Sequence, residues 1–410
     1  MSSESMHSLS PVGASVRAVR QAPPSAQIIL KLFSKLRHGS LKLRTPDGAQ
    51  LLFGDGGELV TLELASWDVF GAALRSGDIG FAEAYIDGSW STDNLTGLIA
   101  LMARNRAAIE GLVYGSWWGS LLYRVKHFMN RNSKAGSRKN INAHYDIGND
   151  FYKLWLDPSM TYSSALFTAA TGGDLALGQA AKYRSILNQL QVKPGDKVLE
   201  IGCGWGGFAE LAAREGQVHV TGLTLSRQQL AYAQARLDKA GLAGMTDLRL
   251  CDYRDSTGQY DAIASIEMFE AVGESYWSSY FECIARSLKP GGRACVQTIV
   301  IADELFERYR ASTDFIQQYI FPGGMLPSPA VFERMAFEHG LTVTSQFCFG
   351  IDYADTLVAW RRAFHARLDE VRAQGFDERF IRTWEFYLCY CEAAFREKNT
   401  DVMHVTLTRT

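Results

Sequence analysis

The residues best suited to chemistry lie in a glycine-rich stretch, residues 198–207 (VLEIGCGWGG), where an apolar run meets a helical pattern. Gly202, Gly204 and Gly206 let the backbone turn tightly and approach a ligand closely. The helix that follows offers free N–H groups at its N-terminus. Because dinucleotide-binding enzymes share this pattern, the glycines alone predict a nucleotide-type ligand without specifying which one.

Three further features favour S-adenosylmethionine over a dinucleotide. Glu200 precedes the glycines by two positions, where a carboxylate would meet the cationic end of a methionine moiety and repel a pyrophosphate. Thr224 and Leu225 end the next strand, and Gln229 follows one helical turn later, whereas a dinucleotide enzyme more often has an acidic residue there. An acidic and aromatic group that suits an adenine follows the third strand: Asp252, Tyr253 and Arg254.

Strand and helix patterns alternate through the second half of the chain. Strands are expected at residues 41–43, 59–64, 197–201, 218–223, 248–251, 262–266 and 293–301. Helices are expected around residues 68–74, 95–103, 208–214 and 227–240. The alternation predicts a parallel sheet with helices on both faces, which is a doubly wound α/β fold. Together with the three features that favour S-adenosylmethionine, it indicates the Rossmann-like class I methyltransferase type.

The length of 410 residues predicts two domains, each with its own core. Trp117 and Trp118 lie between them, with basic residues after them, and fit either a membrane-interface helix or a helix packed between domains. The expected segments are a disordered tail (1–26), a small N-terminal α+β accessory domain (27–105), a helical connector (106–140) and a methyltransferase domain (141–410).

Composition excludes several classes of protein. A net charge of -2 argues against a nucleic-acid partner. Residues 1–139 nevertheless hold 16 Lys and Arg against 11 Asp and Glu, which suits either anionic lipid headgroups or a solvated face. Seven cysteines without a CxxC pair predict neither a disulfide framework nor a zinc site. With no secretory signal and no long apolar stretch, the expected location is the cytoplasm, peripheral on the inner face of the membrane.

The chain resembles the cyclopropane-fatty-acyl-phospholipid synthase family, which includes the mycolic acid cyclopropane synthases. The matching motifs are residues 144–152, 156–158, 161–163, 202–207, 222–226 with Gln229, 268–273, 319–324, 355–357 with Trp360, 387–388 and 394–396. The N-terminal part resembles the lipid-binding-like accessory domain of the phospholipid-acting members through residues 77–80, 83–85 and 87–88. Because the mycolic acid branch lacks that domain, the resemblance implies an unsaturated membrane phospholipid at a bilayer surface as the substrate.

This resemblance implies a reaction in which an alkene attacks the methyl group of S-adenosylmethionine, and a base then removes a proton from the new methyl so that a ring closes. In the family the base is a bound bicarbonate, held by a Cys, a Glu, a His with a nearby Ile, and a Tyr. Three of these positions match and two differ: Glu270, Ile299 and Tyr387 match, Ser164 replaces the Cys and Gln297 replaces the His. The resemblance also places Tyr162 and Ser163 in the cofactor pocket, and Ile266 is the remaining residue expected to bind the cofactor.

The two departures keep more than one product open. Ser164 can still offer a hydroxyl, and Gln297 can donate a hydrogen bond but cannot titrate near neutral pH. A cyclopropane is the leading expectation, and a methyl-branched or methylene chain is the alternative. A soluble small-molecule methyltransferase and a non-catalytic lipid-binding protein are rival functions, and a homodimer is kept open. No metal is expected.

Overall fold

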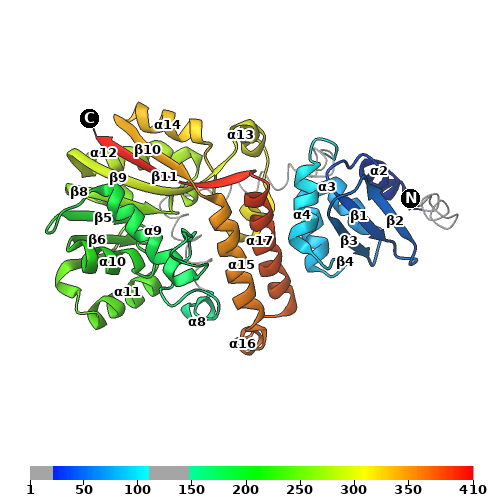
Figure 1. Ribbon diagram of the computed structural model, residues 1–410, viewed down its shortest axis with the longest axis horizontal. Helices are drawn as coiled ribbons and strands as arrows, with labels where there is room; N and C mark the ends of the chain where they lie inside the picture. The colour runs from blue at the N-terminus through cyan, green and yellow to red at the C-terminus, as the bar shows by residue number, and fades with distance from the viewer. Residues whose placement is uncertain (1–21, 110–146, 410) are drawn as a thin grey trace, which may run out of the picture. The chain divides into compact units, whose positions relative to one another are not determined.

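The computed structural model describes residues 22–109 and 147–409, and Figure 1 labels most of their helices and strands. They divide into two compact units. The first comprises residues 22–109 with Arg382–Ala393, and the second comprises residues 147–381 and 394–409. The sequence did not predict that a C-terminal segment would belong to the first unit.

Some predictions fall on residues that the structure does not describe. These include residues 1–21 of the expected tail, most of the expected connector with Trp117 and Trp118, and the start of the motif at 144–152. Within the described part, helix α2 begins at Pro24, inside the expected tail. A proline in the first turn suits a helix start because its missing N–H is not needed there.

The first unit is built on a four-stranded sheet in the order β2-β1-β3-β4. Strand β1 pairs antiparallel with β2 and parallel with β3. The prediction missed β2, which follows the turn at residues 46–48. The elements are α2 (Pro24–Phe33), β1 (Ser40–Arg44), β2 (Gln50–Gly54), β3 (Leu59–Leu64), α3 (Asp68–Ile86), β4 (Trp90–Ser91) and α4 (Leu95–Arg104).

Buried and partly buried hydrogen bonds join the C-terminal segment to the rest of this unit. The Tyr390 hydroxyl donates to an Asp78 carboxylate oxygen at 2.8 Å. The Thr96 hydroxyl donates to a Glu392 carboxylate oxygen at 2.9 Å. These contacts come from residues about 300 positions apart in the chain, which is why sequence patterns near either one could not reveal them.

The second unit contains a seven-stranded sheet in the order β10-β11-β9-β8-β5-β6-β7 (Figure 1). Its strands are β5 (Lys197–Ile201), β6 (His219–Thr224), β7 (Thr246–Leu250), β8 (Tyr260–Ile266), β9 (Leu288–Ile301), β10 (Leu341–Cys348) and β11 (Thr400–Arg409). Its α-helices are α8 (Asn149–Tyr152), α9 (Leu175–Leu190), α10 (Gly207–Gly216), α11 (Arg227–Lys239), α12 (Trp277–Ser287), α13 (Asp303–Arg310), α14 (Pro329–Glu338), α15 (Gly350–His365) and α16 (Leu368–Ala373).

Helix α17 (Glu378–Arg396) begins and ends in the second unit, and its middle is the segment Arg382–Ala393. Short helical turns complete the second unit: η1 (Ala243–Met245), η2 (Tyr253–Asp255), η3 (Phe269–Ala271), η4 (Glu274–Tyr276) and η5 (Ile316–Ile320).

The predicted doubly wound α/β fold is confirmed, with one correction. Strands β5 to β9 are mutually parallel, as expected. Strand β11, however, runs antiparallel to both β9 and β10. The sequence did not predict these last two strands, because β10 is largely exposed and β11 buries His404 and Thr406 among its apolar residues, so neither reads as a plain apolar run.

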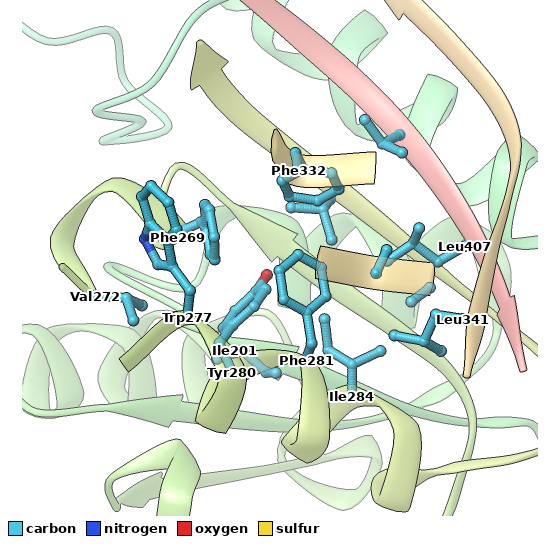
Figure 2. Close-up of a cluster of buried hydrophobic side chains, with 14 of the residues drawn as sticks. Ile201, Phe269, Val272, Trp277, Tyr280, Phe281, Ile284, Phe332, Leu341 and Leu407 are labelled. Atoms are coloured by element: carbon cyan, nitrogen blue, oxygen red, sulfur yellow. The ribbon is translucent and has the colours of Figure 1, made fainter. Parts of the chain in front are cut away.

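Side chains alternate between the two faces of the parallel strands, and each face has its own core. Val198 and Ala262 point to the face covered by α9 and α10. Leu199, Ile201 and Ile263 point to the opposite face, covered by α12 and α14. Figure 2 shows this second core, in which Ile201, Tyr280, Phe281, Phe332 and Leu407 pack together.

We expect Phe281 to contribute strongly to stability, because it is fully buried and its ring lies 5.1 Å from that of Phe332. Phe281→Ala should lower the free energy of unfolding by about 3–5 kcal/mol through lost contacts and a cavity. Urea unfolding followed by circular dichroism measures this. Phe337, which is 77% exposed on α14, is the matched control, and Phe337→Ala should change stability by less than about 0.5 kcal/mol. Equal effects of the two substitutions would contradict the packing described here.

Candidate cofactor and methyl-transfer site

The glycine loop joins β5 to α10 with a backbone that other residues adopt with difficulty. Gly202 and Gly206 have φ angles of +87° and +81°. A Cβ on Gly202 would lie 2.9 Å from Cγ of Met268, and one on Gly206 would lie 3.0 Å from Cβ of Ala233. The Cys203 N–H donates to the Leu223 carbonyl at 2.8 Å, which fixes the loop to β6. The loop therefore lies at the carboxyl edge of the sheet, where such folds bind ligands.

Glu200 lies under this loop with an incomplete set of partners. Its side chain is 2% exposed, and its Oε2 atom is buried without a hydrogen-bond partner. Burial raises the pKa of this carboxyl to about 8, although the charges of Arg236 and Lys182 act in the opposite direction. An orphaned carboxylate oxygen is costly unless a ligand completes it, so the site fits a cationic group such as the one the sequence predicts.

Beyond β6, the predicted residues form a small hydrogen-bonded turn. The Thr224 hydroxyl donates to the Gln229 side-chain oxygen at 2.9 Å, and the Ser226 hydroxyl caps α11 by accepting from the Gln229 N–H. Leu225 is half-buried between them. The turn places a hydroxyl and an amide together at the strand end, and their contact with the cofactor stays a prediction.

After β7, Asp252 is already engaged within the chain. Both of its carboxylate oxygens accept from Arg254, at 2.8 Å from Nε and 2.6 Å from the terminal nitrogen. The Tyr253 hydroxyl is buried without a partner, and the Arg254 guanidinium lies 5.5 Å from the Tyr253 ring. The adenine contact of this group stays a prediction, and the ion pair with Arg254 is an additional feature that the sequence did not reveal.

Tyr162 and Ser163 lie between an aromatic cluster and a buried lysine. The Tyr162 ring lies 5.3 Å from that of Trp360 and 5.4 Å from that of Tyr152. The Ser163 hydroxyl accepts from Nζ of Lys182 at 2.6 Å. Lys182 has no exposed surface, and burial lowers its pKa to about 7 against the opposing charges of Glu267, Asp157 and Glu200.

Ser164 and Gln297, which replace the family Cys and His, converge on a residue that the sequence analysis missed. Oε1 of Glu267 accepts from the Ser164 N–H at 2.8 Å and from the Gln297 side-chain amide at 2.7 Å. Oε2 of Glu267 accepts from the Tyr353 hydroxyl at 2.6 Å. Because a carboxylate of the chain already takes these donors, the residues present do not fit a bicarbonate ion there. The position of Glu267, directly after β8 at the carboxyl edge of the sheet, is the signal that could have identified it.

Glu270 and Ile299 are brought together as predicted, on η3 and β9. Oε1 of Glu270 accepts from the Ile299 N–H and, at 3.0 Å, from the Thr298 hydroxyl. Its Oε2 is buried without a partner. Burial, reinforced by the nearby negative charge of Glu267, raises the pKa of Glu270 to about 8. Ile266, at the end of β8, pairs with Gln297 in the sheet and so lies beside the same group.

Tyr387 belongs to the segment grouped with the first unit, where it is 4% exposed and its ring lies 5.4 Å from that of Trp384. Its expected place beside Glu270 stays a prediction. His404 is a second residue that sequence reasoning missed. It is fully buried on β11, and its Nε2 lies 2.8 Å from the Gln297 side-chain oxygen.

Comparison with known proteins places the chain among relatives. A family model described as mycolic acid cyclopropane synthetase matches residues 132–405. The chain belongs to this family. The tuberculostearic acid methyltransferase UfaA1 of Mycobacterium tuberculosis is 38% identical over 82% of this chain and 80% of its own length. The cyclopropane-fatty-acyl-phospholipid synthase of Escherichia coli is 35% identical over 83% of this chain and 86% of its own length.

Solved structures of the same family share the fold. Mycolic acid cyclopropane synthase CmaA1, complexed with SAH and CTAB, matches with a TM-score of 0.62 and 32% identity over 66% of this chain and 98% of its own. Cyclopropane synthase MmaA2 from Mycobacterium tuberculosis matches with a TM-score of 0.62 and 31% identity over the same shares. The protein is therefore an S-adenosylmethionine-dependent C-methyltransferase. Bound S-adenosylmethionine supplies an electrophilic methyl group, and Glu200 with the glycine loop would hold its methionine end.

The backbone of the glycine loop should be required for cofactor binding in this family member. Gly202→Ala forces a side chain into a left-handed conformation, which costs about 1–2 kcal/mol, so the dissociation constant for S-adenosylmethionine should rise about tenfold or more. Isothermal titration calorimetry measures this. Gly244→Ala is the matched control, because a Cβ there meets nothing within 4 Å and the affinity should not change. An unchanged affinity in Gly202→Ala would show that the loop does not approach the cofactor.

Glu200 should make cofactor binding depend on pH. Below its pKa of about 8 the empty site holds a largely protonated carboxyl, and a cationic ligand favours the ionised form, so binding releases a proton. Affinity should therefore rise with pH between about 6 and about 7.5, by up to about tenfold per pH unit. Calorimetry in buffers of different ionisation enthalpy measures the proton release. Glu200→Gln should abolish it, whereas Glu215→Gln, a surface exchange on α10, should not.

Proposed function

We propose that this methyltransferase acts on lipid acyl chains, at the double bond of an unsaturated membrane phospholipid, and that its product is a cyclopropane ring. The extent of similarity carries the choice of phospholipid. The match to the Escherichia coli phospholipid synthase covers 83% of this chain, whereas that to cyclopropane mycolic acid synthase 2 of Mycobacterium bovis covers 66% of this chain and 94% of the relative. The larger share of this chain that matches the phospholipid synthase supports a role for the N-terminal unit in binding phospholipid.

The chemistry of the second unit supports methyl transfer to an alkene. Alkylation of a double bond leaves positive charge on the adjacent carbon. Aromatic faces and carboxylates stabilise such charge in a site from which water is excluded. Tyr162, Trp360 and Tyr353 form a connected set of rings, with centroids 5.3 Å and 6.1 Å from that of Trp360. Glu267 accepts from the hydroxyl of this same Tyr353, so rings and carboxylates belong to one site.

We also propose that the enzyme binds the cytoplasmic face of the membrane from the surface. No helix in residues 22–109 or 147–409 is both long and apolar enough to cross a bilayer. In the first unit, Leu52 and Leu59 are 62% and 56% exposed, and Lys42 pairs with Leu52 across the sheet. Exposed leucines beside a cation support contact with an anionic lipid surface.

A second candidate product is a methylene or methyl-branched chain. The observation that favours it is the pair of departures at Ser164 and Gln297, where the family has Cys and His. UfaA1, named as a tuberculostearic acid methyltransferase, is among the similar relatives. If a hydride shift precedes proton loss, the same cation yields the methylene chain, and a saturated methyl branch then requires a separate hydride donor to reduce the new double bond.

Product analysis tests the proposal. The purified full-length protein, incubated with S-adenosylmethionine and dioleoyl phosphatidylglycerol vesicles, should add one CH2 to the oleoyl chains. Proton magnetic resonance of the extracted lipid should then show ring protons and no new olefinic signals. New olefinic signals from a =CH2 group would favour the second candidate instead.

Distearoyl phosphatidylglycerol vesicles, which contain no double bond, are the matched control and should receive no methyl group. Faster methylation of lipid-free small molecules than of vesicles would contradict a lipid substrate. Absence of methyl transfer to any unsaturated lipid would contradict the proposed function as a whole.

A further inference from the structure

Glu267 occupies the donors that the family resemblance assigns to a bound anion. Its Oε1 is held by the Ser164 N–H and the Gln297 amide, at 2.8 Å and 2.7 Å, and its Oε2 by the Tyr353 hydroxyl. We propose that this built-in carboxylate replaces the bicarbonate and is the base that accepts the proton after methyl transfer. The inference rests on the proposed function, and it identifies a catalytic residue for that same site.

The orientation of Gln297 is imposed by a buried chain of hydrogen bonds. The Gln189 amide donates to Nδ1 of His404 at 3.0 Å, and Nε2–H of His404 donates to the Gln297 oxygen at 2.8 Å. The imidazole is assigned with its proton on Nε2, because Nδ1 then accepts from the Gln189 amide and Nε2–H donates to the Gln297 oxygen. It leaves the Gln297 NH2 facing Glu267. Gln189 and His404 are therefore positioning residues that keep a donor directed at the carboxylate.

The backbone of Glu267 is held in a conformation that a non-glycine residue rarely adopts. Its φ angle is +48°, in the left-handed region. Its N–H donates to the Gln297 carbonyl at 2.8 Å, so β9 holds both the main chain and the side chain of this residue. Such strain, of order 1 kcal/mol or more, persists where the surroundings impose it, commonly at functional sites. Here it aims the carboxylate at the two donors.

Hydrogen bonding distinguishes Glu267 from its neighbour Glu270. Burial raises the pKa of Glu267, and the charge of Lys182 with hydrogen bonds from Tyr353, Ser164 and Gln297 opposes that rise. Both oxygens of Glu267 have donors that stabilise the carboxylate form. Glu270 has an unpartnered oxygen and a pKa raised to about 8, so it is mainly protonated at neutral pH and can donate a hydrogen bond. A pair of carboxyls in different environments is the usual arrangement for separate acid and base roles.

The proton step balances without a further reactant. The alkene π pair forms the new carbon–carbon bond to the transferred methyl, and the sulfur keeps the pair of the bond that breaks. The neighbouring carbon is then cationic. A proton leaves the new methyl for the Glu267 carboxylate, and the C–H pair closes the ring. If a hydride has first shifted to the cationic carbon, loss of the same proton gives a methylene chain, so Glu267 serves either product.

The test uses the full-length protein with unsaturated vesicles, with dissolved carbon dioxide either removed or replaced by added bicarbonate. Wild-type turnover should be the same in both conditions. Glu267→Gln should lower turnover about 100-fold or more, the size of effect expected for loss of a general base, with unchanged affinity for S-adenosylmethionine. Glu274→Gln, which alters an exposed ion pair with Arg310, is the matched control and should keep wild-type turnover. Glu270→Gln should retain more activity than Glu267→Gln. A glutamine amide can donate a hydrogen bond as a protonated carboxyl does, but it cannot accept a proton as a carboxylate does.

Glu267→Gly supplies a rescue experiment, because glycine tolerates the φ angle of +48° and its lack of a side chain frees the Ser164 and Gln297 donors. Added bicarbonate should raise the turnover of this variant at least about tenfold and leave the wild type unchanged. Bicarbonate titrated into the protein by calorimetry should bind Glu267→Gly and not the wild type. The calorimetric measurement needs no lipid, so it tests the inference separately from the proposed function. If the folded wild-type protein methylates no vesicle, that result refutes the proposed function and leaves the calorimetric test valid.

Two results would overturn the inference while leaving the proposed function intact. One is a wild-type enzyme that loses activity when bicarbonate is removed and regains it when bicarbonate returns. The other is wild-type turnover in Glu267→Gln.

Discussion

A lysine with no exposed surface lies under the ligand site, and the arrangement of the site depends on how its charge is balanced. Lys182 donates to the Ser163 hydroxyl and faces the charges of Glu267, Asp157 and Glu200. Burial lowers the pKa of Lys182 to about 7, and the three acidic groups oppose this shift by stabilising the protonated amine. The segment that carries Ser163, helix α9 and the ends of β5 and β8 meet at this lysine. The same balance keeps acidic groups in an interior that would otherwise exclude them.

These buried charges also give the three carboxyls of the site different properties. Glu200 lies under the glycine loop with an unpartnered oxygen, which suits a cationic ligand. Glu270 has a similar unpartnered oxygen and a raised pKa. Burial also raises the pKa of Glu267, but this carboxyl has hydrogen-bond donors to both oxygens. Hydrogen bonding and burial thus differ over a few residues, which suits Glu200 to a cationic ligand, Glu270 to a neutral donor role and Glu267 to the proposed role of base.

The antiparallel strand at the end of the chain makes this possible. In β11, His404 lies directly opposite Gln297 of β9, and β9 in turn runs beside β8, which ends next to Glu267. Strand register therefore connects three polar side chains in one line across the sheet. The contact with His404 on β11 fixes which end of the Gln297 side chain is the oxygen, so its NH2 group faces Glu267.

The sequence by itself determined much of the nucleotide-binding half. Residues 197–201 were predicted as β5 at its observed bounds, and the glycine loop with Glu200 was placed at the correct strand end. Local patterns suffice there because alternation of apolar residues and turn glycines acts over a few positions. The tertiary structure alone decided the contact of Glu267 with Gln297 and His404, and the assignment of Arg382–Ala393 to the first unit. Those contacts join residues far apart in the chain, and strand register and burial, which set them, depend on how the whole sheet packs.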